Sequence, residues 1–193
     1  MHSTRKAAPV RTLRAGLTAL VGATLLLAVL SGVAGAATTG TTTTTFTLTG
    51  GSISITVPST TVNFAAVSVS AGSITAQLGT ITVNDGRGLL NGSWTSTVSS
   101  SRFIAGGQTA AEPIDVTSVS YWSGAPTATS GVGTLLGGEP TPGAAVAISA
   151  AQTAFTGGSL IGNNSASWNP TLITTPSAAV VGTYTGTVTH TVA

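Results

Sequence analysis

The sequence has no cysteine and very little charge. Without cysteine no disulfide can form, so a folded domain must be held by packing and backbone hydrogen bonds. Only six basic and four acidic residues are present, and four of the basic ones lie within residues 5–14. Residues 37–193 contain no lysine, and Arg87 and Arg102 are their only arginines. A nucleic-acid binder needs a cluster of cations to displace counterions from phosphates, so this class of protein is excluded.

An apolar run follows the basic N-terminal segment. It extends from Leu17 to Val33 and leads into Ala34-Gly35-Ala36, with small residues at the two positions that a signal peptidase inspects. This order predicts a secretory signal peptide over residues 1–36, cleaved after Ala36. The alternative is an uncleaved membrane anchor, because the run is at the short edge of the ~17–25 residues that span a bilayer. The cleavage site favours removal, so we expect a secreted, extracellular protein without membrane attachment after processing.

Helix-forming residues are scarce in the rest of the chain. Thr, Ser, Val, Ile, Ala and Gly dominate, and no segment after the signal has helical periodicity. Many short alternating runs separated by turn residues are typical of a β-sandwich. The sequence therefore predicts an all-β fold: a Thr-rich flexible leader over residues 37–45, then a single antiparallel β-sandwich over residues 46–193 with long Gly/Pro/Ala-rich loops.

Period-two alternation predicts where the strands lie. It is clearest in residues 183–192, where every second residue is Thr and the other face carries Tyr184, Val188, His190 and Val192. Residues 122–145 are rich in Gly, Pro, Ala and Ser, and we expect a long loop there. A second irregular stretch is expected around Trp168-Asn-Pro170. Further strands are expected at Phe46–Leu48, Ile53–Val57, Val67–Val69, Ile74–Leu78, Ile81–Val83, Trp94–Val98, Ile114–Val116, residues 146–149 and residues 172–175.

Few side chains of this chain can support catalysis. Its carboxylates are Asp85, Glu112, Asp115 and Glu139. A polysaccharide hydrolase would need two of them to converge in one cleft. Glu112 and Asp115, which lie three residues apart, are interpreted instead as solvated charges. His190 lies on the apolar face of the last strand and is interpreted as a hydrogen-bonded core or rim histidine. We expect no enzyme activity, no metal and no cofactor. The Asn84-Asp85-Gly86 turn lacks the further acidic ligands of a calcium site.

The three tryptophans are the candidate contacts for a glycan, because exposed rings stack on sugars through their apolar faces. Trp94 alternates with Ser96 and Val98 and is interpreted chiefly as a core residue. Trp122, next to Tyr121 at the start of the expected loop, is the better surface platform. Trp168 is compatible with either role.

Several of these residues stand in a familiar order. Val83-Asn-Asp85-Gly86-Arg87-Gly88 precedes Trp94, and the chain closes on residues 182–192 with Tyr184 and Val192. This order resembles the WxL domain of Gram-positive surface proteins, with Ser96 in place of the motif Leu and His190 in place of the second Trp. The resemblance implies export and non-covalent attachment to the cell wall, with peptidoglycan as ligand and the motif residues as contacts.

Together these features predict an exported, non-catalytic cell-surface protein attached to the wall through its sandwich. The candidate ligand-binding residues are Trp94, Trp122, Tyr184 and His190. No sorting motif or hydrophobic helix follows the last strand, so we expect the domain itself to do the holding. The partners would be peptidoglycan or another surface glycan, and other surface proteins. The alternative is a freely secreted structural or self-associating protein that pairs through Thr-rich strand edges carrying no Lys.

Overall fold

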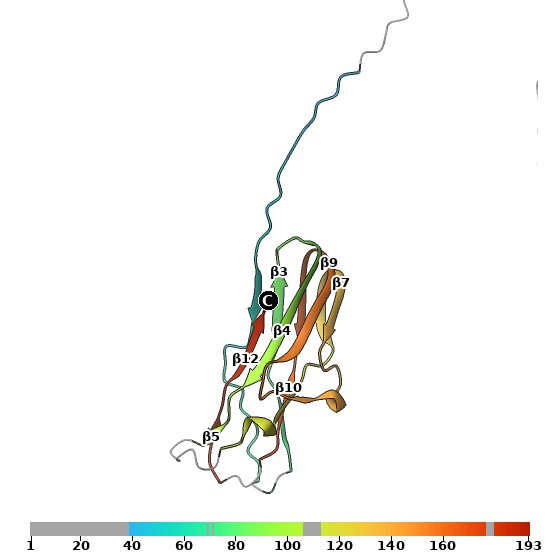
Figure 1. Cartoon of the computed structure of the whole chain (residues 1–193). Helices are drawn as coiled ribbons and strands as arrows, with labels where there is room; N and C mark the ends of the chain where they lie inside the picture. The colour runs from blue at the N-terminus through green and yellow to red at the C-terminus, as the bar shows by residue number, and fades with distance from the viewer. Residues whose placement is uncertain (1–38, 69, 71, 106–112, 177–179) are drawn as a thin grey trace, which may run out of the picture. The chain divides into compact units, whose positions relative to one another are not determined.

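The computed structural model describes residues 39–68, 70, 72–105, 113–176 and 180–193. The expected signal segment, its cleavage site after Ala36, and Glu112 lie outside these residues. Phe46–Ala193 forms one compact unit. It is an all-β, antiparallel, sandwich-like fold with two short 3-10 helices, η1 (Val116–Ser118) and η2 (Pro142–Ala144) (Figure 1). Among the described residues, no helix is long and apolar enough to cross a membrane.

The larger sheet has six strands, and all of its pairings are antiparallel. Its order is β1-β3-β9-β4-β12, and β7 pairs with the other side of β9. The strands are β1 (Ile53–Thr56), β3 (Ile81–Asp85), β4 (Leu90–Ser100), β7 (Pro126–Gly137), β9 (Gln152–Trp168) and β12 (Val188–Val192).

The smaller sheet covers the core from the other side. Its order is β2-β10-β6-β8, and a separate two-stranded ladder joins β11 to β5. The strands are β2 (Ile74–Gln77), β5 (Ile104–Ala105), β6 (Val119–Trp122), β8 (Val146–Ala147), β10 (Thr171–Thr174) and β11 (Tyr184–Thr185).

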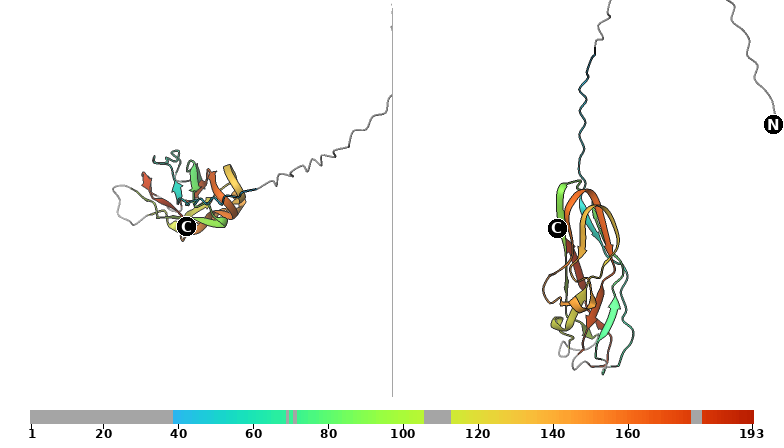
Figure 2. Two further views of the ribbon diagram at one scale, coloured as in Figure 1. Left: turned by 90° about the horizontal axis from the view of Figure 1, so that it is seen from above. Right: turned by 90° about the vertical axis from the view of Figure 1, so that its right-hand side faces the viewer.

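Three segments of the larger sheet bend over together at one end (Figures 1 and 2). β9 pairs with β4 through its first part, up to Ile161 opposite Leu90, and with β3 through its second part, from Asn164 opposite Asp85. Each bending segment has a glycine with positive φ at this level: Gly88 (65°), Gly131 (90°) and Gly162 (71°). Residues with a Cβ are strained in that conformation, so glycine lets the sheet fold over its own core. We call residues 86–89, 131–133 and 162–163 the arch end.

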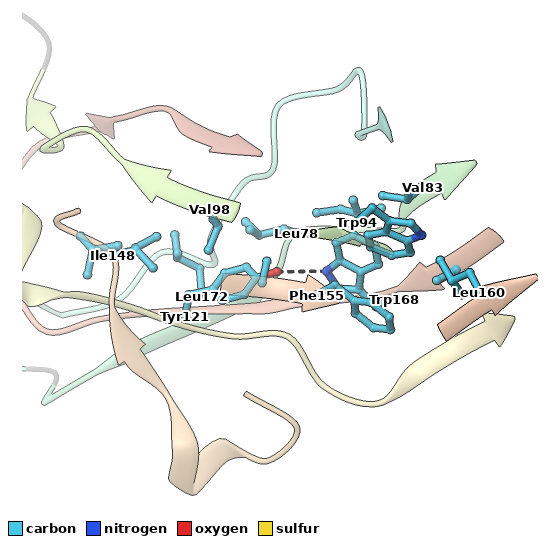
Figure 3. Close-up of a cluster of buried hydrophobic side chains, with 14 of the residues drawn as sticks. Leu78, Val83, Trp94, Val98, Tyr121, Ile148, Phe155, Leu160, Trp168 and Leu172 are labelled. Carbon is cyan, nitrogen blue, oxygen red and sulfur yellow. Dashed lines mark hydrogen bonds between the residues drawn. The ribbon is translucent and has the colours of Figure 1, made fainter. Parts of the chain in front are cut away.

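A stack of three aromatic rings fills the core beneath the arch end (Figure 3). Phe155 lies between two indoles, with ring centroids 6.0 Å from Trp94 and 4.6 Å from Trp168. The indole N–H of Trp168 donates to the hydroxyl of Tyr121 over 3.0 Å, which joins β9 of the larger sheet to β6 of the smaller one. All of these rings are almost fully buried.

The expected loop over residues 122–145 was wrong in its central part. Residues 126–137 form β7, whose register with β9 shifts at three places. A Cβ on Gly131 would come within 2.6 Å of the carbonyl oxygen of Asn163, and one on Gly137 within 2.4 Å of the Gly124 carbonyl oxygen. Glycine is therefore needed for close backbone approach and bulges, and its frequency made a strand resemble a loop.

The second irregular stretch was also wrong, because it contains the central strand of the larger sheet. Every second residue from Asn164 to Trp168 is buried, but Asn164 and Ala166 are not large apolar residues. The alternation is present while its hydrophobic signal is weak. The strand expected at Phe46–Leu48 is also absent. Of the strand expected at Val67–Val69, the described residues 67 and 68 have no regular structure, and Val69 lies outside the described residues. The expected alternation of the last strand is confirmed in β12.

Candidate functional site

A buried polar network forms just below the arch end, where Asp85, Arg87 and Trp94 of the WxL-like order meet. The guanidinium of Arg87 donates to both carboxylate oxygens of Asp85, over 2.8 and 3.0 Å, and to the carbonyl of Ser93 over 2.8 Å. The side-chain amide of Asn164 donates to Asp85 over 3.2 Å and accepts from the indole N–H of Trp94 over 2.9 Å. Four residues from three strands and a turn are thus joined in one chain of hydrogen bonds.

This network has the character of a structural tie. Asp85 and Asn164 are 3% and 4% exposed, so neither offers a surface to a ligand. Hydrogen bonds from Arg87 lower the pKa of Asp85 to about 2, which keeps the carboxylate charged for its partner. The buried carboxylate of Asp85 must be paired. Its contacts with Arg87 and, through Asn164, with Trp94 therefore hold the arch end closed.

The tryptophans differ in their access to a ligand. Trp94 is 2% exposed and Trp168 is fully buried, so their faces contact Phe155 and cannot reach a sugar. The core interpretation of Trp94 agrees with this position. Trp122 is half-buried at the end of β6. Its ring lies near Gly124, where an added Cβ would be 3.5 Å from the indole edge.

Tyr184 is held by the backbone of its own turn. It is half-buried in β11, and its hydroxyl both donates to the carbonyl of Val180 over 2.8 Å and accepts from the Val180 N–H over 3.0 Å. Both contacts fix the approach to the last strand. The structure does not bring Tyr184, Trp94 and Trp122 together with His190 into one surface.

A groove of about 290 Å³ lies beside the first half of β12. Its walls are mainly apolar and come from widely separated parts of the chain. The segment after β1 contributes Val57, Pro58, Val62 and Phe64, and the core contributes Leu78, Ile81, Phe103 and Leu172. Val188 and His190 come from β12 and Gly186 from the residues just before it, and the remaining lining residues are Thr60, Thr61, Thr185 and Thr187. Among the residues that line it, none carries a carboxylate, ammonium or guanidinium group.

His190 is the only titratable group among these lining residues. Its Nε2 lies 3.3 Å from the hydroxyl of Tyr121, and the two rings are tilted at 57° with centroids 5.6 Å apart. Burial lowers the pKa of His190 to about 4, so the imidazole is neutral near pH 7. A neutral, half-buried histidine bonded to a core tyrosine fits the rim-histidine interpretation.

The described carboxylates lie in separate structural settings. Asp115 caps η1 by accepting from the backbone and hydroxyl of Thr117, over 2.9 and 2.8 Å. Glu139 is buried beside Ser123, whose hydroxyl accepts from the Glu139 backbone N–H, and burial raises its pKa to about 7. No hydrogen bond joins Asp85, Asp115 and Glu139. Within the described part of the chain, no group of three metal-ligating side chains is present.

Sequence reasoning missed residues of both the buried polar network and the groove. Asn164 was not singled out, although it connects Trp94 to Asp85. Val62, Phe64 and Phe103 were not recognised as walls of a groove. The signal for Asn164 was the period-two order Asn164-Ser-Ala166-Ser-Trp168. No family model, curated protein or solved structure matches this chain.

Proposed function

We propose that this chain is an exported, non-catalytic protein of the cell surface that holds to cell-wall glycan through its sandwich. The observation that carries the proposal is the surface formed by β7. Its first nine residues are exposed, it is an edge strand, and it carries hydroxyl groups without any charge. Neutral hydroxyls and a partly exposed ring suit a hydrated sugar polymer, where hydrogen bonds and stacking supply the affinity.

Three side chains define the contact surface in this proposal. Thr127 and Ser130 lie on β7, and each is already hydrogen-bonded to β9. The Thr127 hydroxyl donates to the carbonyl of Ser167, and the hydroxyls of Ser130 and Ser165 share a hydrogen bond. Those bonds fix the hydroxyl positions before a ligand arrives, which lowers the entropy cost of binding. Trp122 ends β6, four residues before β7 begins, and supplies the ring. The order resembling a WxL domain supports peptidoglycan as the ligand.

A sedimentation experiment tests this proposal. Purified residues 37–193 are mixed with isolated Gram-positive walls, with and without their secondary polymers, and the pelleted fraction is measured. We expect sedimentation with bare peptidoglycan, and a weakening of about threefold to tenfold in Trp122→Ala, since an aromatic contact contributes ~0.5–1.5 kcal/mol. Leu90→Ala is the control, because it removes a side chain that is 83% exposed on β4. Protein that stays in the supernatant with both preparations would refute wall attachment.

A second candidate function, self-association, is favoured by one specific observation. β7 pairs with β9 on one side only, and its first nine residues are exposed. An unpaired strand edge without charged side chains is a template for another strand.

A further inference from the structure

The buried hydroxyl of Tyr121 has two hydrogen-bond neighbours. It lies 3.0 Å from the indole nitrogen of Trp168 (Figure 3) and 3.3 Å from Nε2 of His190. A tryptophan N–H can only donate, so the Tyr121 oxygen accepts from Trp168. The hydroxyl hydrogen of a fully buried tyrosine also needs an acceptor, and among the described residues Nε2 of His190 is the one within reach. Tyr121 therefore donates to His190.

This direction of donation fixes the tautomer of His190. A neutral imidazole carries one hydrogen, and the ring nitrogen that accepts a hydrogen bond cannot hold it. Since Nε2 accepts from Tyr121, the hydrogen is on Nδ1. Burial lowers the pKa of His190 to about 4, so the ring is neutral near pH 7 and keeps this arrangement. His190 thus presents one N–H donor that Tyr121 and Trp168 set from the core.

The Nδ1–H group is available to a ligand. Nδ1 forms no hydrogen bond with the described residues, and it is not shielded from solvent as the unpaired hydroxyl of Ser96 is. The side chain of His190 is half-buried, and it lines the groove. In small-molecule sites, a polar group among mainly apolar walls orients the ligand. The groove therefore combines apolar walls with one preset donor.

We propose that the groove binds a neutral molecule with an apolar body and a carbonyl oxygen, and that the Nδ1–H of His190 donates to this oxygen. The groove has a volume of about 290 Å³, whereas a cavity of ~150 Å³ holds one benzene molecule. The volume thus admits a ring or a short aliphatic chain together with its carbonyl group. Val62, Phe64 and Val188 would contact the apolar body. Trp122 does not line the groove, so this inference stands independently of wall binding.

The lining also excludes two other classes of ligand. It carries no carboxylate, ammonium or guanidinium group, and His190 is neutral near pH 7. A charged ligand would leave water without an ion to pair with, which costs more than one hydrogen bond returns. A hydrocarbon would fit the walls but would cover the Nδ1–H group without giving it an acceptor. A neutral carbonyl compound avoids both costs.

Nuclear magnetic resonance tests the donor directly, because His190 is the only histidine in residues 37–193. A long-range proton–nitrogen correlation spectrum of the imidazole distinguishes its two nitrogens. We expect the hydrogen on Nδ1 in the natural chain near pH 7. In Tyr121→Phe, which cannot donate to Nε2, we expect part of the population to carry it on Nε2 instead. A hydrogen on Nε2 in the natural chain would refute the proposal, because Nδ1 would have none to give.

Three ligands of similar shape identify the class that binds. Acetophenone, cumene and benzoate have the same number of non-hydrogen atoms and the same branching, but they offer a neutral carbonyl, no polar atom and a carboxylate. We expect acetophenone to bind near pH 7 and to shift the Nδ1 resonance of His190. Cumene should bind without that shift, and benzoate should not bind. Benzoate that binds as tightly as acetophenone would overturn the proposal. Failure of acetophenone to bind, or to shift the Nδ1 resonance, would also overturn it.

Matched variants locate the ligand in the groove. Val62→Ala shortens a groove wall and should weaken acetophenone binding about threefold. Val67→Ala makes the same change at a 47% exposed position outside the lining and should have no effect. Tyr121→Phe should lower the affinity for acetophenone relative to cumene by about twofold to tenfold, the effect of one hydrogen bond. Equal effects of the two valine variants would contradict binding in the groove. The spectra of the natural chain decide the proposal even if Tyr121→Phe does not fold.

Discussion

The arch end of the larger sheet and its groove end, meaning the first half of β12 and the groove beside it, complete their hydrogen bonds differently. At the arch end, Asp85, Arg87, Asn164 and Trp94 satisfy one another within the chain. Beside the groove, β12 is hydrogen-bonded to β4 alone and has β1 along its other side, and the groove lining carries no carboxylate, ammonium or guanidinium group. Asp85, Arg87 and Trp94 of the WxL-like order thus meet where the fold is closed, whereas Tyr184 and His190 lie on β11 and β12.

Removing the central carboxylate should produce the largest effect on this comparison. Asp85→Ala leaves Arg87 and Asn164 without their shared acceptor, and breaking a buried pair costs ~3 kcal/mol or more in free energy of unfolding. Urea unfolding followed by tryptophan fluorescence measures the loss. Asp115→Ala is the control, since it removes an exposed carboxylate that caps only η1. Similar losses in both variants would contradict the distinct role of the network.

Two adjacent glycines of β9 test how tightly the arch end is packed. A Cβ on Gly157 would lie 2.6 Å from the indole nitrogen of Trp94, whereas a Cβ on Gly158 meets nothing within 4 Å. Gly157→Ala should therefore cost ~2 kcal/mol by overpacking. Gly158→Ala should be neutral or slightly stabilising, because it restricts the unfolded chain. Equal midpoints of thermal unfolding in the two variants would show that the Trp94 indole can move aside, and would contradict tight packing against Gly157.

The two ends should lose stability in different pH ranges. The pKa of His190 falls from 6.5 to about 4 on folding, so below pH 6.5 the unfolded chain binds a proton that the folded chain does not. The stability that neutral His190 contributes is present above pH 6.5 and is lost, by up to ~3 kcal/mol, as the pH falls to about 4. The pKa of Asp85 falls from 3.8 to about 2, so the arch end weakens only between those values.

Glu139 opposes the effect of His190 and must be removed to see it. Its pKa rises from 4.5 to about 7 on folding, so its contribution is complete below pH 4.5 and is lost as the pH rises through about 7. In Glu139→Gln, urea unfolding should show stability increasing from pH 4 to 6.5. Adding His190→Gln should flatten that rise. A rise that persists in the double variant would assign it to another group.

The smallest expected effect is a gain in stability from a substitution on β4, at a position between the arch end and the groove end. Ser96 lies on β4 opposite Val192, is fully buried, and its hydroxyl has no hydrogen-bond partner. An unpaired buried hydroxyl is costly, so Ser96→Ala should raise the free energy of unfolding by ~1 kcal/mol. Ser93→Ala, at an exposed position of the same strand, should change little. A loss in Ser96→Ala would mean that the hydroxyl is bonded in solution.

The strands that could be predicted are those with large apolar residues on one face. Ile81, Val83 and Val98 alternate with hydroxyl residues, and the structure buries each of them. β7 and β9 could not be predicted in this way, because their inner positions include Gly157, Asn164 and other residues selected by what they touch. Hydrophobic periodicity measures burial against water, and it fails where close backbone approach decides the residue.

The candidate site shows the same division. The sequence by itself determined an all-β chain of low charge, and the last strand with His190 among its inward residues. Only the tertiary structure decided that Trp94 is a buried donor to Asn164 and that a groove opens beside β12. Alternation along one strand is a local property of the polypeptide. A groove depends on segments distant in sequence, here from Val57 to His190.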